Sequence, residues 1–441
     1  MIPPTAPKLD DLVAAARRGF TERFAAPPIV AASAPGRINV IGEHTDYNDG
    51  LALPGAIDRW AVVALSPRDD DSIRIYSEAF GERIEARLGE PAEADASSTI
   101  QSASPPRRKP LGDREAKPAA ILSSSDRSAS RRSGQVQDDE NDWSALAIGV
   151  GRLHAAAAGV WQGFDALIGG NVPVGAGVSS SAAVEMALLN ALRAAFGSGV
   201  EDLELVRLGQ RVEHEYLGVA TGLMDQYTAQ LSRPGSLMLI DFRELTHEYV
   251  DVGLDGWAWL LLDSGVRHEL AASAYGERVR ETRAALQQVM RADRGVRSFR
   301  DLTEAHLGCV AEQPSRRRLR HYLRENERVR RAVDAVAAGE AAELGRLILA
   351  SHASLRDDYA VSCPELDLLV EAAGAVDGCA GARMMGGGFG GCTINLVREN
   401  AVDVVVAEAA ATFRRRFGRA PGAGVFRLVG GAVIHGLPGA A

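Results

Sequence analysis

The chain has 441 residues, 46% of them hydrophobic and 24% charged, a size and composition that allow two globular domains with their own cores. Its 49 basic and 58 acidic residues give a formal net charge of −9, which excludes a global basic field for nucleic acid or an anionic membrane. Four scattered cysteines without metal-ligand spacing, and an N-terminus without an apolar leader, predict a soluble cytoplasmic protein.

Apolar spacing along the chain predicts a mixture of helices and strands. In chain order, helices are expected over residues 10–25, 143–159, 182–196, 202–217, 269–291, 317–338, 341–356 and 401–417. Strands are expected within 32–65, where a loop at 42–50 interrupts them, and over 72–76, 164–168, 258–263, 382–385 and 392–397. Strict alternation of strand and helix is lacking, which favours an α+β fold. The turn Pro234-Gly235 places a boundary nearby, giving domains 1–240 and 241–441.

Residues 92–142 lose hydrophobic periodicity. The segment is rich in Ser, Pro and Arg and contains no aromatic side chain. Such a composition cannot bury enough apolar area to offset the entropy of ordering, so a disordered insertion is predicted. The chain has only three lysines, Lys8, Lys109 and Lys117, and none follows a glycine-rich loop. A phosphate-binding lysine of the Walker type is therefore excluded.

A loop rich in glycine and serine, from Pro173 to Ser181, lies between a predicted strand and a predicted helix. Gly175 and Gly177 would let backbone amides approach a ligand, and a helix N-terminus offers unpaired N–H groups and a favourable dipole. Serine is also a common N-cap residue. The loop alone therefore leaves two interpretations open, a phosphate cradle and a plain helix start.

A second glycine loop, Gly386 to Gly391, has five glycines in six residues between two predicted strands. It is either a hinge or bulge, or a place where the backbone approaches a ligand closely. Because so many glycines raise the entropy of the unfolded chain, close approach to a ligand is favoured.

Polar side chains gather in a third segment, from Gly36 to Gly50, which contains Arg37, Glu43, His44 and Asp46. This density could fix several hydroxyl groups of a sugar, although the end of the segment is also typical of a solvated turn. A fourth feature is Asp225, an acid in apolar surroundings. Taken alone it is better explained as a helix cap than as a catalytic base.

Together these segments resemble the GHMP small-molecule kinases. Three motifs of that family occur in the expected order, over residues 36–54, 173–183 and 383–393. The segments GRINVIGEHTDYNDG (36–50) and SHASLRDDYAVSCPELDLLV (351–370) are most similar to the branch of the family that phosphorylates galactose. The likeness covers nearly the whole chain outside residues 92–142.

The resemblance implies a two-domain α+β fold with the site between the domains. The N-terminal domain would resemble domain 2 of ribosomal protein S5, and the C-terminal domain would be ferredoxin-like. The implied reaction transfers the γ-phosphoryl group of ATP, with Mg²⁺, to the C1 hydroxyl of galactose. The implied partners are galactose and ATP, with neither nucleic acid nor membrane, and a monomer is expected.

Residue roles also follow from the resemblance. Asp225 would be the catalytic base and Arg37 its cationic partner, while Ser181 and Glu213 would hold Mg²⁺. Galactose would be bound by Glu43, His44, Asp46, Gly222 and Tyr275. ATP would contact residues of the two glycine loops, namely Gly175, Ala176, Gly177, Val178, Ser179, Ser180, Ser181, Ala182, Gly387 and Gly388.

Two positions depart from the family pattern. Met385 stands where a small polar residue is more common, and no aromatic residue follows Trp143 within residues 143–151, which leaves the adenine pocket undefined. Two alternatives stay open: a kinase for N-acetylgalactosamine or arabinose, and a galactose sensor that has the same fold without catalysis. The intact Arg37, Asp225 and serine run argue against the sensor.

Overall fold

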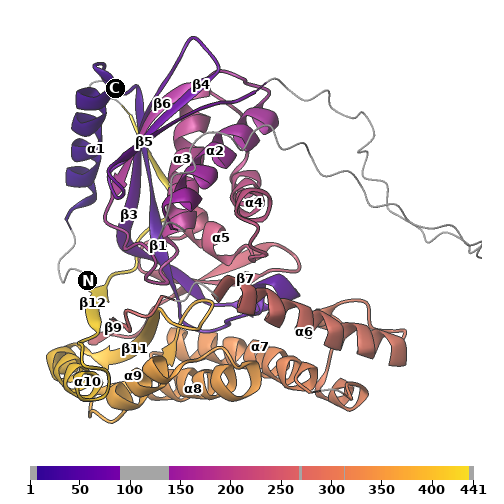
Figure 1. The fold of residues 1–441 in the computed structure, drawn as a ribbon. Coiled ribbons are helices and arrows are strands. Elements are labelled where there is room, and N and C mark those ends of the chain that lie inside the picture. Colours follow the sequence, from indigo (N-terminus) through magenta and orange to yellow (C-terminus); the bar gives the residue numbers. More distant parts are fainter. Residues whose placement is uncertain (1–6, 90–138, 268–270, 312, 437–441) are drawn as a thin grey trace, which may run out of the picture.

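The computed structural model describes residues 7–89, 139–267, 271–311 and 313–436 (Figure 1). The predicted insertion, 92–142, lies outside these residues except for its last four positions. There the structure has helix already, because α2 begins at Asp139 and not at Trp143. Within the described ranges, no helix is long and apolar enough to cross a membrane.

The described chain mixes helices and strands, as the sequence predicts. The helices are α1 (Leu9–Phe24), α2 (Asp139–Ala158), α3 (Ser180–Phe196), α4 (Asp202–Val212), α5 (Met224–Leu231), α6 (Ala271–Ala292), α7 (Ser315–Ala337), α8 (Ala341–Ser354), α9 (Pro364–Gly374) and α10 (Val402–Phe417). The strands are β1 (Val30–Asn39), β2 (Leu51–Ala52), β3 (Pro54–Pro67), β4 (Ser72–Ser77), β5 (Glu82–Arg87), β6 (Phe164–Gly170), β7 (Ser236–Asp241), β8 (Thr246–Asp251), β9 (Trp257–Asp263), β10 (Cys379–Met384), β11 (Cys392–Arg398), β12 (Gly422–Phe426) and β13 (Val433–His435).

The N-terminal half is built on a six-stranded sheet in the order β13-β1-β3-β6-β4-β5. Its pairs are antiparallel except for β4 with β6. Helix α1 covers one face, and α2 to α5 cover the other (Figure 1). Every position of β1 is buried, as expected for a strand covered on both faces, whereas β4 alternates in burial, as its sequence predicts.

The C-terminal half carries an antiparallel four-stranded sheet in the order β10-β11-β9-β12. Helices α9 and α10 pack on one face around Leu260 and Phe413. The other face contributes Leu261 and Ile394 to a core that also contains Ile38 and Leu53 of the N-terminal half. One hydrophobic core therefore joins the two halves.

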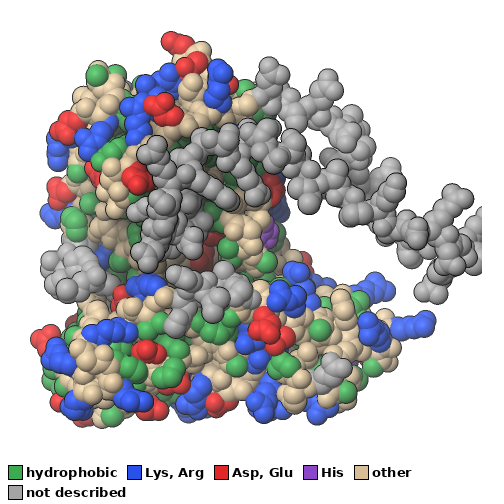
Figure 2. Space-filling model, in the orientation of Figure 1, with side chains coloured by type: hydrophobic (Ala, Val, Ile, Leu, Met, Phe, Trp, Pro, Cys, Tyr) green, Lys and Arg blue, Asp and Glu red, His purple; other side chains and the backbone are tan. Residues whose placement is uncertain are grey.

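Two further connections cross between the halves. A three-stranded sheet, β2-β7-β8, lies at the junction, and the last strand, β13, returns to pair with β1. The domain boundary near residue 240 falls within β7 and stays a prediction. In the view of Figure 2, acidic and basic side chains are interspersed over both halves.

Candidate active site

A cavity of about 250 Å³ lies where the two halves meet. The loop after β1 and the start of α5 line it from the N-terminal half, and α6 and the second glycine loop line it from the C-terminal half. The predicted site residues that it brings together are Arg37, Glu43, His44, Asp46, Glu213, Gly222, Asp225, Tyr275, Gly387 and Gly388.

Arg37 and Asp225 form a two-pronged ion pair in this cavity. Nε of Arg37 donates to Oδ1 at 2.7 Å and Nη2 donates to Oδ2 at 3.0 Å, while Nη1 donates to the carbonyl of Gly177 at 2.8 Å. Burial lowers the pKa of Arg37, but Asp225, Glu43 and Asp46 outweigh burial and leave the pKa raised. The guanidinium is therefore a fixed positive charge beside the carboxylate.

The helix-cap interpretation is wrong for Asp225, and Ser179 makes no side-chain cap. Asp225 lies in the first turn of α5, whose N-cap is Leu223 and has no side-chain cap hydrogen bond. Ser179 is the N-cap of α3, but its Oγ donates to Oδ2 of Asp225 and not to the helix. Its backbone is left-handed, with φ 60° and ψ 54°. The side chain thus serves the site and leaves the first N–H groups of α3 available to an anion.

A second cavity, of about 540 Å³, opens at the same helix start. Gly175, Ser180 and Ser181 line it, together with the stacked aromatic rings of Phe80 and Trp143, whose centroids are 5.7 Å apart. Three predicted ATP contacts are buried: Ala176 and Val178 of the loop, and Ala182 of α3. Phe80 was missed by sequence reasoning because it follows β4, far along the chain from the glycine loops.

Glu213 is hydrogen-bonded to Ser181, the residue with which the resemblance pairs it. Ser181 Oγ donates to Oε1 of Glu213 at 3.3 Å, and Thr221 Oγ1 donates to Oε2. Burial raises the pKa of Glu213 to about 7, and the charge of Asp225 adds to the rise. Glu213 opens the π-helical turn Glu213–Leu217, so the predicted helix 202–217 is α-helical only to Val212. A π-helical turn often marks a functional site.

Among the sugar-binding candidates, Glu43, His44 and Gly222 are buried and Asp46 and Tyr275 are half-buried, so the solvated-turn interpretation is wrong for the first part of the segment. Nδ1 of His44 and Oη of Tyr47 share a hydrogen bond of 2.8 Å. Burial lowers the pKa of His44 to about 3, which keeps the ring neutral. Its Nε2 is buried without a hydrogen-bond partner among the described residues. The rings of His44 and Tyr275 lie 5.4 Å apart.

The side chain of Asp46 explains why position 222 is a glycine. A Cβ at position 222 would lie 1.8 Å from Oδ2 of Asp46, so only glycine allows this carboxyl group its place at the cavity. Burial and the charges of Asp225 and Glu43 together raise the pKa of Asp46 to about 7. The side chain is therefore balanced between its neutral and charged forms near neutral pH.

Three residues near the site were missed. Glu185, on α3, is fully buried and accepts from Gln226 Nε2 at 2.9 Å; burial raises its pKa well above the usual range. Arg267 lines the larger cavity and pairs with Asp263 at 2.8 Å. Arg383 is fully buried against Glu43. An acid or an arginine inside an apolar run was the signal that could have found Glu185 and Arg383.

Family models match three parts of the chain. The galactokinase galactose-binding signature matches residues 18–67, the GHMP kinases N terminal domain matches 145–233, and the GHMP kinases C terminal model matches 332–415. A galactokinase of Chloroflexus aggregans is 38% identical over 408 residues, covering 91% of this chain and 92% of the relative. This chain belongs to the galactokinases of the GHMP kinase family.

Human galactokinase is 36% identical, with 90% of each chain covered. Among solved structures, Lactococcus lactis galactokinase complexed with galactose has a TM-score of 0.79 at 30% identity, covering 96% of this chain and 99% of that one. A mevalonate kinase, at 15% identity and a TM-score of 0.56, shares the fold alone. The predicted two-domain α+β GHMP kinase fold is thereby confirmed.

Proposed function

We propose that this galactokinase transfers the γ-phosphoryl group of ATP to the C1 hydroxyl of galactose, giving galactose 1-phosphate and ADP. ATP-dependent phosphorylation of galactose is the activity of the family to which the chain belongs. The observation that carries the residue roles is the Arg37–Asp225 ion pair, which lies in the smaller cavity and contacts the glycine loop at the start of α3.

Asp225 is the proposed general base. Its Oδ2 already accepts from Arg37 and Ser179, whereas Oδ1 accepts from Arg37 alone. Oδ1 therefore has the greater remaining capacity to take the proton of the attacking sugar hydroxyl. Phosphoryl transfer needs mainly positioning and charge stabilisation, and the Arg37 guanidinium supplies a fixed positive charge beside the reacting groups.

The nucleotide is assigned to the larger cavity. The N–H groups at the start of α3 and the Ser180 and Ser181 side chains face the phosphates in this proposal. Arg267, at the same cavity, supplies a cation that no lysine provides. The adenine is assigned to Trp143 and Phe80, because Trp143 Nε1 is a buried donor without a partner among the described residues.

Ser181 and Glu213 suit Mg²⁺. They present two hard oxygens, a hydroxyl and a carboxylate, within hydrogen-bond distance of each other. Phosphate oxygens and water would supply the other ligands of the ion. When bound, Mg²⁺ offsets the negative charge of the phosphates.

Galactose is assigned to the smaller cavity, whose size suits a single sugar ring better than a nucleotide. Glu43, Asp46 and the unpartnered Nε2 of His44 would take its hydroxyl groups, and Tyr275 would cover the ring. A pocket that hydrogen-bonds each hydroxyl discriminates against an epimer, because misplaced groups leave buried partners unpaired. The monomeric state and cytoplasmic location stay predictions from the sequence.

Two variants test the role of Asp225 as general base separately from the role of Glu213 as metal ligand. Asp225→Asn is expected to lower kcat by about 10²–10⁴-fold while galactose affinity, measured by calorimetry, changes little. Glu213→Gln is expected to keep measurable turnover but to raise the Mg²⁺ concentration for half-maximal rate. ADP release is the readout for both. Turnover of Asp225→Asn within threefold of wild type, or an unchanged Mg²⁺ dependence of Glu213→Gln, would contradict these assignments.

A further inference from the structure

The loop that carries Glu43 is held from the opposite half of the molecule. The Gly42 N–H donates to Oε1 of Glu325 at 3.0 Å, and the Glu43 carbonyl lies 3.0 Å from Nε2 of His321, so that nitrogen donates. The Glu43 side chain accepts from Arg383 Nη2 at 3.1 Å. Glu325 and His321 belong to α7 and Arg383 to β10. The C-terminal half therefore sets the conformation of this N-terminal loop.

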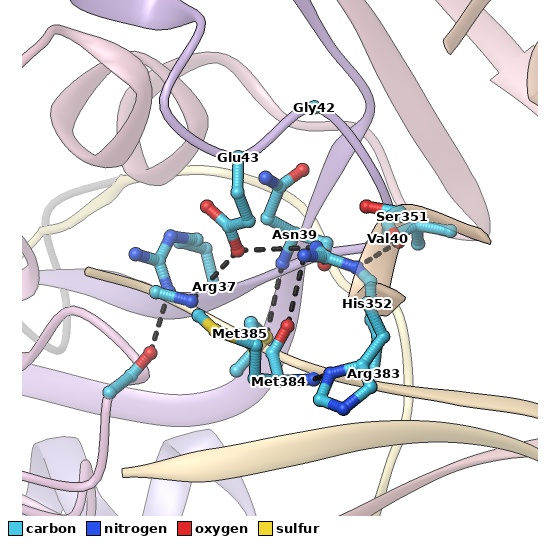
Figure 3. A network of polar contacts seen from close by, with 12 residues as sticks. Arg37, Asn39, Val40, Gly42, Glu43, Ser351, His352, Arg383, Met384 and Met385 are labelled. Atoms are coloured by element: carbon cyan, nitrogen blue, oxygen red, sulfur yellow. Dashed lines mark hydrogen bonds and ion pairs between the residues drawn. The ribbon is translucent and has the colours of Figure 1, made fainter. Parts of the chain in front are cut away.

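Arg383 is the centre of these contacts (Figure 3). Its side chain is fully buried, and each guanidinium nitrogen donates to a main-chain carbonyl. Nε donates to Val40 at 2.8 Å, Nη1 to Met384 at 3.0 Å and Nη2 to Asn39 at 2.5 Å. Glu43 is the carboxylate that neutralises this buried charge. A rigid fork with so many fixed partners has little freedom to move.

One oxygen of Glu43 is fixed and the other is available. Oε1 accepts from Arg383 and also from the Gly386 N–H at 2.8 Å. Oε2 receives no hydrogen bond from the described residues, and Glu43 lines the smaller cavity. The direction in which Oε2 faces a ligand is thus determined by the two donors that hold Oε1.

We propose that Arg383 is a positioning residue for the sugar and acts through Glu43. It fixes Oε1, so that Oε2 is preorganised to accept from one hydroxyl group of galactose, and it ties that subsite to the glycine loop through Gly386. The proposal rests on the proposed function, since it assumes that galactose occupies the smaller cavity.

The first test compares Arg383→Lys, Glu43→Ala and the double variant with galactose and with each of its monodeoxy analogues that keep the C1 hydroxyl. Arg383→Lys is expected to raise KM for galactose by about tenfold and to leave KM for ATP within about twofold. It should also lose discrimination against the same deoxy sugar as Glu43→Ala. The double variant should be no worse than Glu43→Ala, because coupled residues are not additive.

Asn395→Ala is the matched control, since Asn395 is a buried polar residue that donates to the Leu260 carbonyl within the C-terminal sheet. It should lower the unfolding midpoint without changing the pattern of deoxy sugars. Additive effects of Arg383→Lys and Glu43→Ala, or an equal rise in KM for ATP, would overturn the proposal. Absence of galactose-dependent ADP release by the wild type would instead refute the proposed function.

Glu43→Gln provides a test that keeps the volume of the side chain if Arg383→Lys does not fold. The two donors that hold Oε1 should fix the amide with its oxygen on Arg383 and its NH₂ group toward the cavity. The variant should then accept the deoxyfluoro analogue of the recognised hydroxyl better than wild type does, because fluorine can only accept. If the variant rejects that analogue as wild type does, the amide is free to rotate and Arg383 does not position it.

Discussion

At the scale of single residues, the site is defined by crowded carboxyl groups. Asp46 and Glu213 have pKa values raised to about 7, and burial and its acidic neighbours raise the pKa of Glu185 well above its usual range. Arg37 is the cation that faces Asp225, Glu43 and Asp46. The charge of the pocket therefore changes around neutral pH.

Asp46 allows a test of this electrostatic picture. Its pKa is raised from 3.8 to about 7, so the folded protein binds the proton more tightly than the unfolded chain. Stability from this group is present below about pH 4 and is lost as pH rises through about 7. Asp46→Asn removes that loss, which is at most about 4 kcal/mol at pH 8.

The unfolding midpoint of Asp46→Asn should therefore exceed that of wild type at pH 8, and the difference should shrink at pH 5. Asp255→Asn, at an exposed position, controls for removal of one negative charge. A midpoint difference that is the same at both pH values would show that Asp46 is not strained by burial.

Some of the site residues could be predicted from sequence motifs, and others could not. Arg37, Asp225, Ser181 and Glu213 came from motifs whose residue types match the chemistry. The structure brings Arg37 into contact with Asp225, and Ser181 with Glu213. Arg383 was not predicted as a partner of Glu43 because 340 positions separate them, and no local pattern reports such a contact.

At the scale of elements, the glycines of the second glycine loop differ in how much space their surroundings leave. Gly386, Gly387 and Gly388 line the smaller cavity, as close approach to a ligand requires. Gly388 also has φ 86°, and a Cβ there would lie 2.2 Å from the Val361 carbonyl oxygen. Its neighbour Gly387 lacks a left-handed φ, and a Cβ there would lie 3.4 Å from Cδ2 of Tyr275, an ordinary contact distance.

These two glycines should respond differently to the same substitution. Gly388→Ala is expected to lower the free energy of unfolding by about 1–3 kcal/mol, because the chain must move to relieve the clash and the strain. Gly387→Ala should fold normally but raise KM for galactose, since its methyl group would narrow the cavity beside Tyr275. Thermal unfolding and steady-state kinetics of both variants are the measurements. Equal stability of the two variants would contradict this division.

Elements were predictable where burial imposes a pattern. The half-buried strand β4 and the long helices α3 and α7 were expected close to their observed bounds. The strands β5 and β8 were missed because most of their side chains are exposed or only partly buried, so hydrophobic alternation is weak. The short β13 has three residues and forms only by pairing with β1, which no local sequence signal reveals.

At the scale of the whole molecule, the halves are interleaved. Their shared core contains Ile38 and Leu53 from one half with Leu261 and Ile394 from the other. The predicted division at residue 240 was made from a turn in the sequence, which carries no information about a strand that returns from the C-terminal end. The fold class itself was recognised through the motifs, because hydrophobic spacing alone indicated only a mixed α+β protein.

Strand β13, which returns from the C-terminal end of the chain, should stabilise β1. β13 pairs with β1 through Ala31, Ala32 and Ser33, and Ser33 Oγ lies 2.9 Å from Nε2 of His435. Ending the chain after residue 431 would expose this edge of β1, and the lost hydrogen bonds should cost about 2–4 kcal/mol in the free energy of unfolding.

Hydrogen exchange should locate that loss, with faster exchange of the β1 amides than in wild type. KM for galactose should change little at 25 °C, because Arg37 lies beyond the segment of β1 that pairs with β13. His435→Ala is the matched variant, since it removes the side-chain contact to Ser33 while keeping the backbone pairing, and it should cost less. Unchanged exchange in β1 after truncation would mean that β3 alone holds the strand, because β3 pairs with β1 from Val30 to Pro35 and again from Arg37 to Asn39.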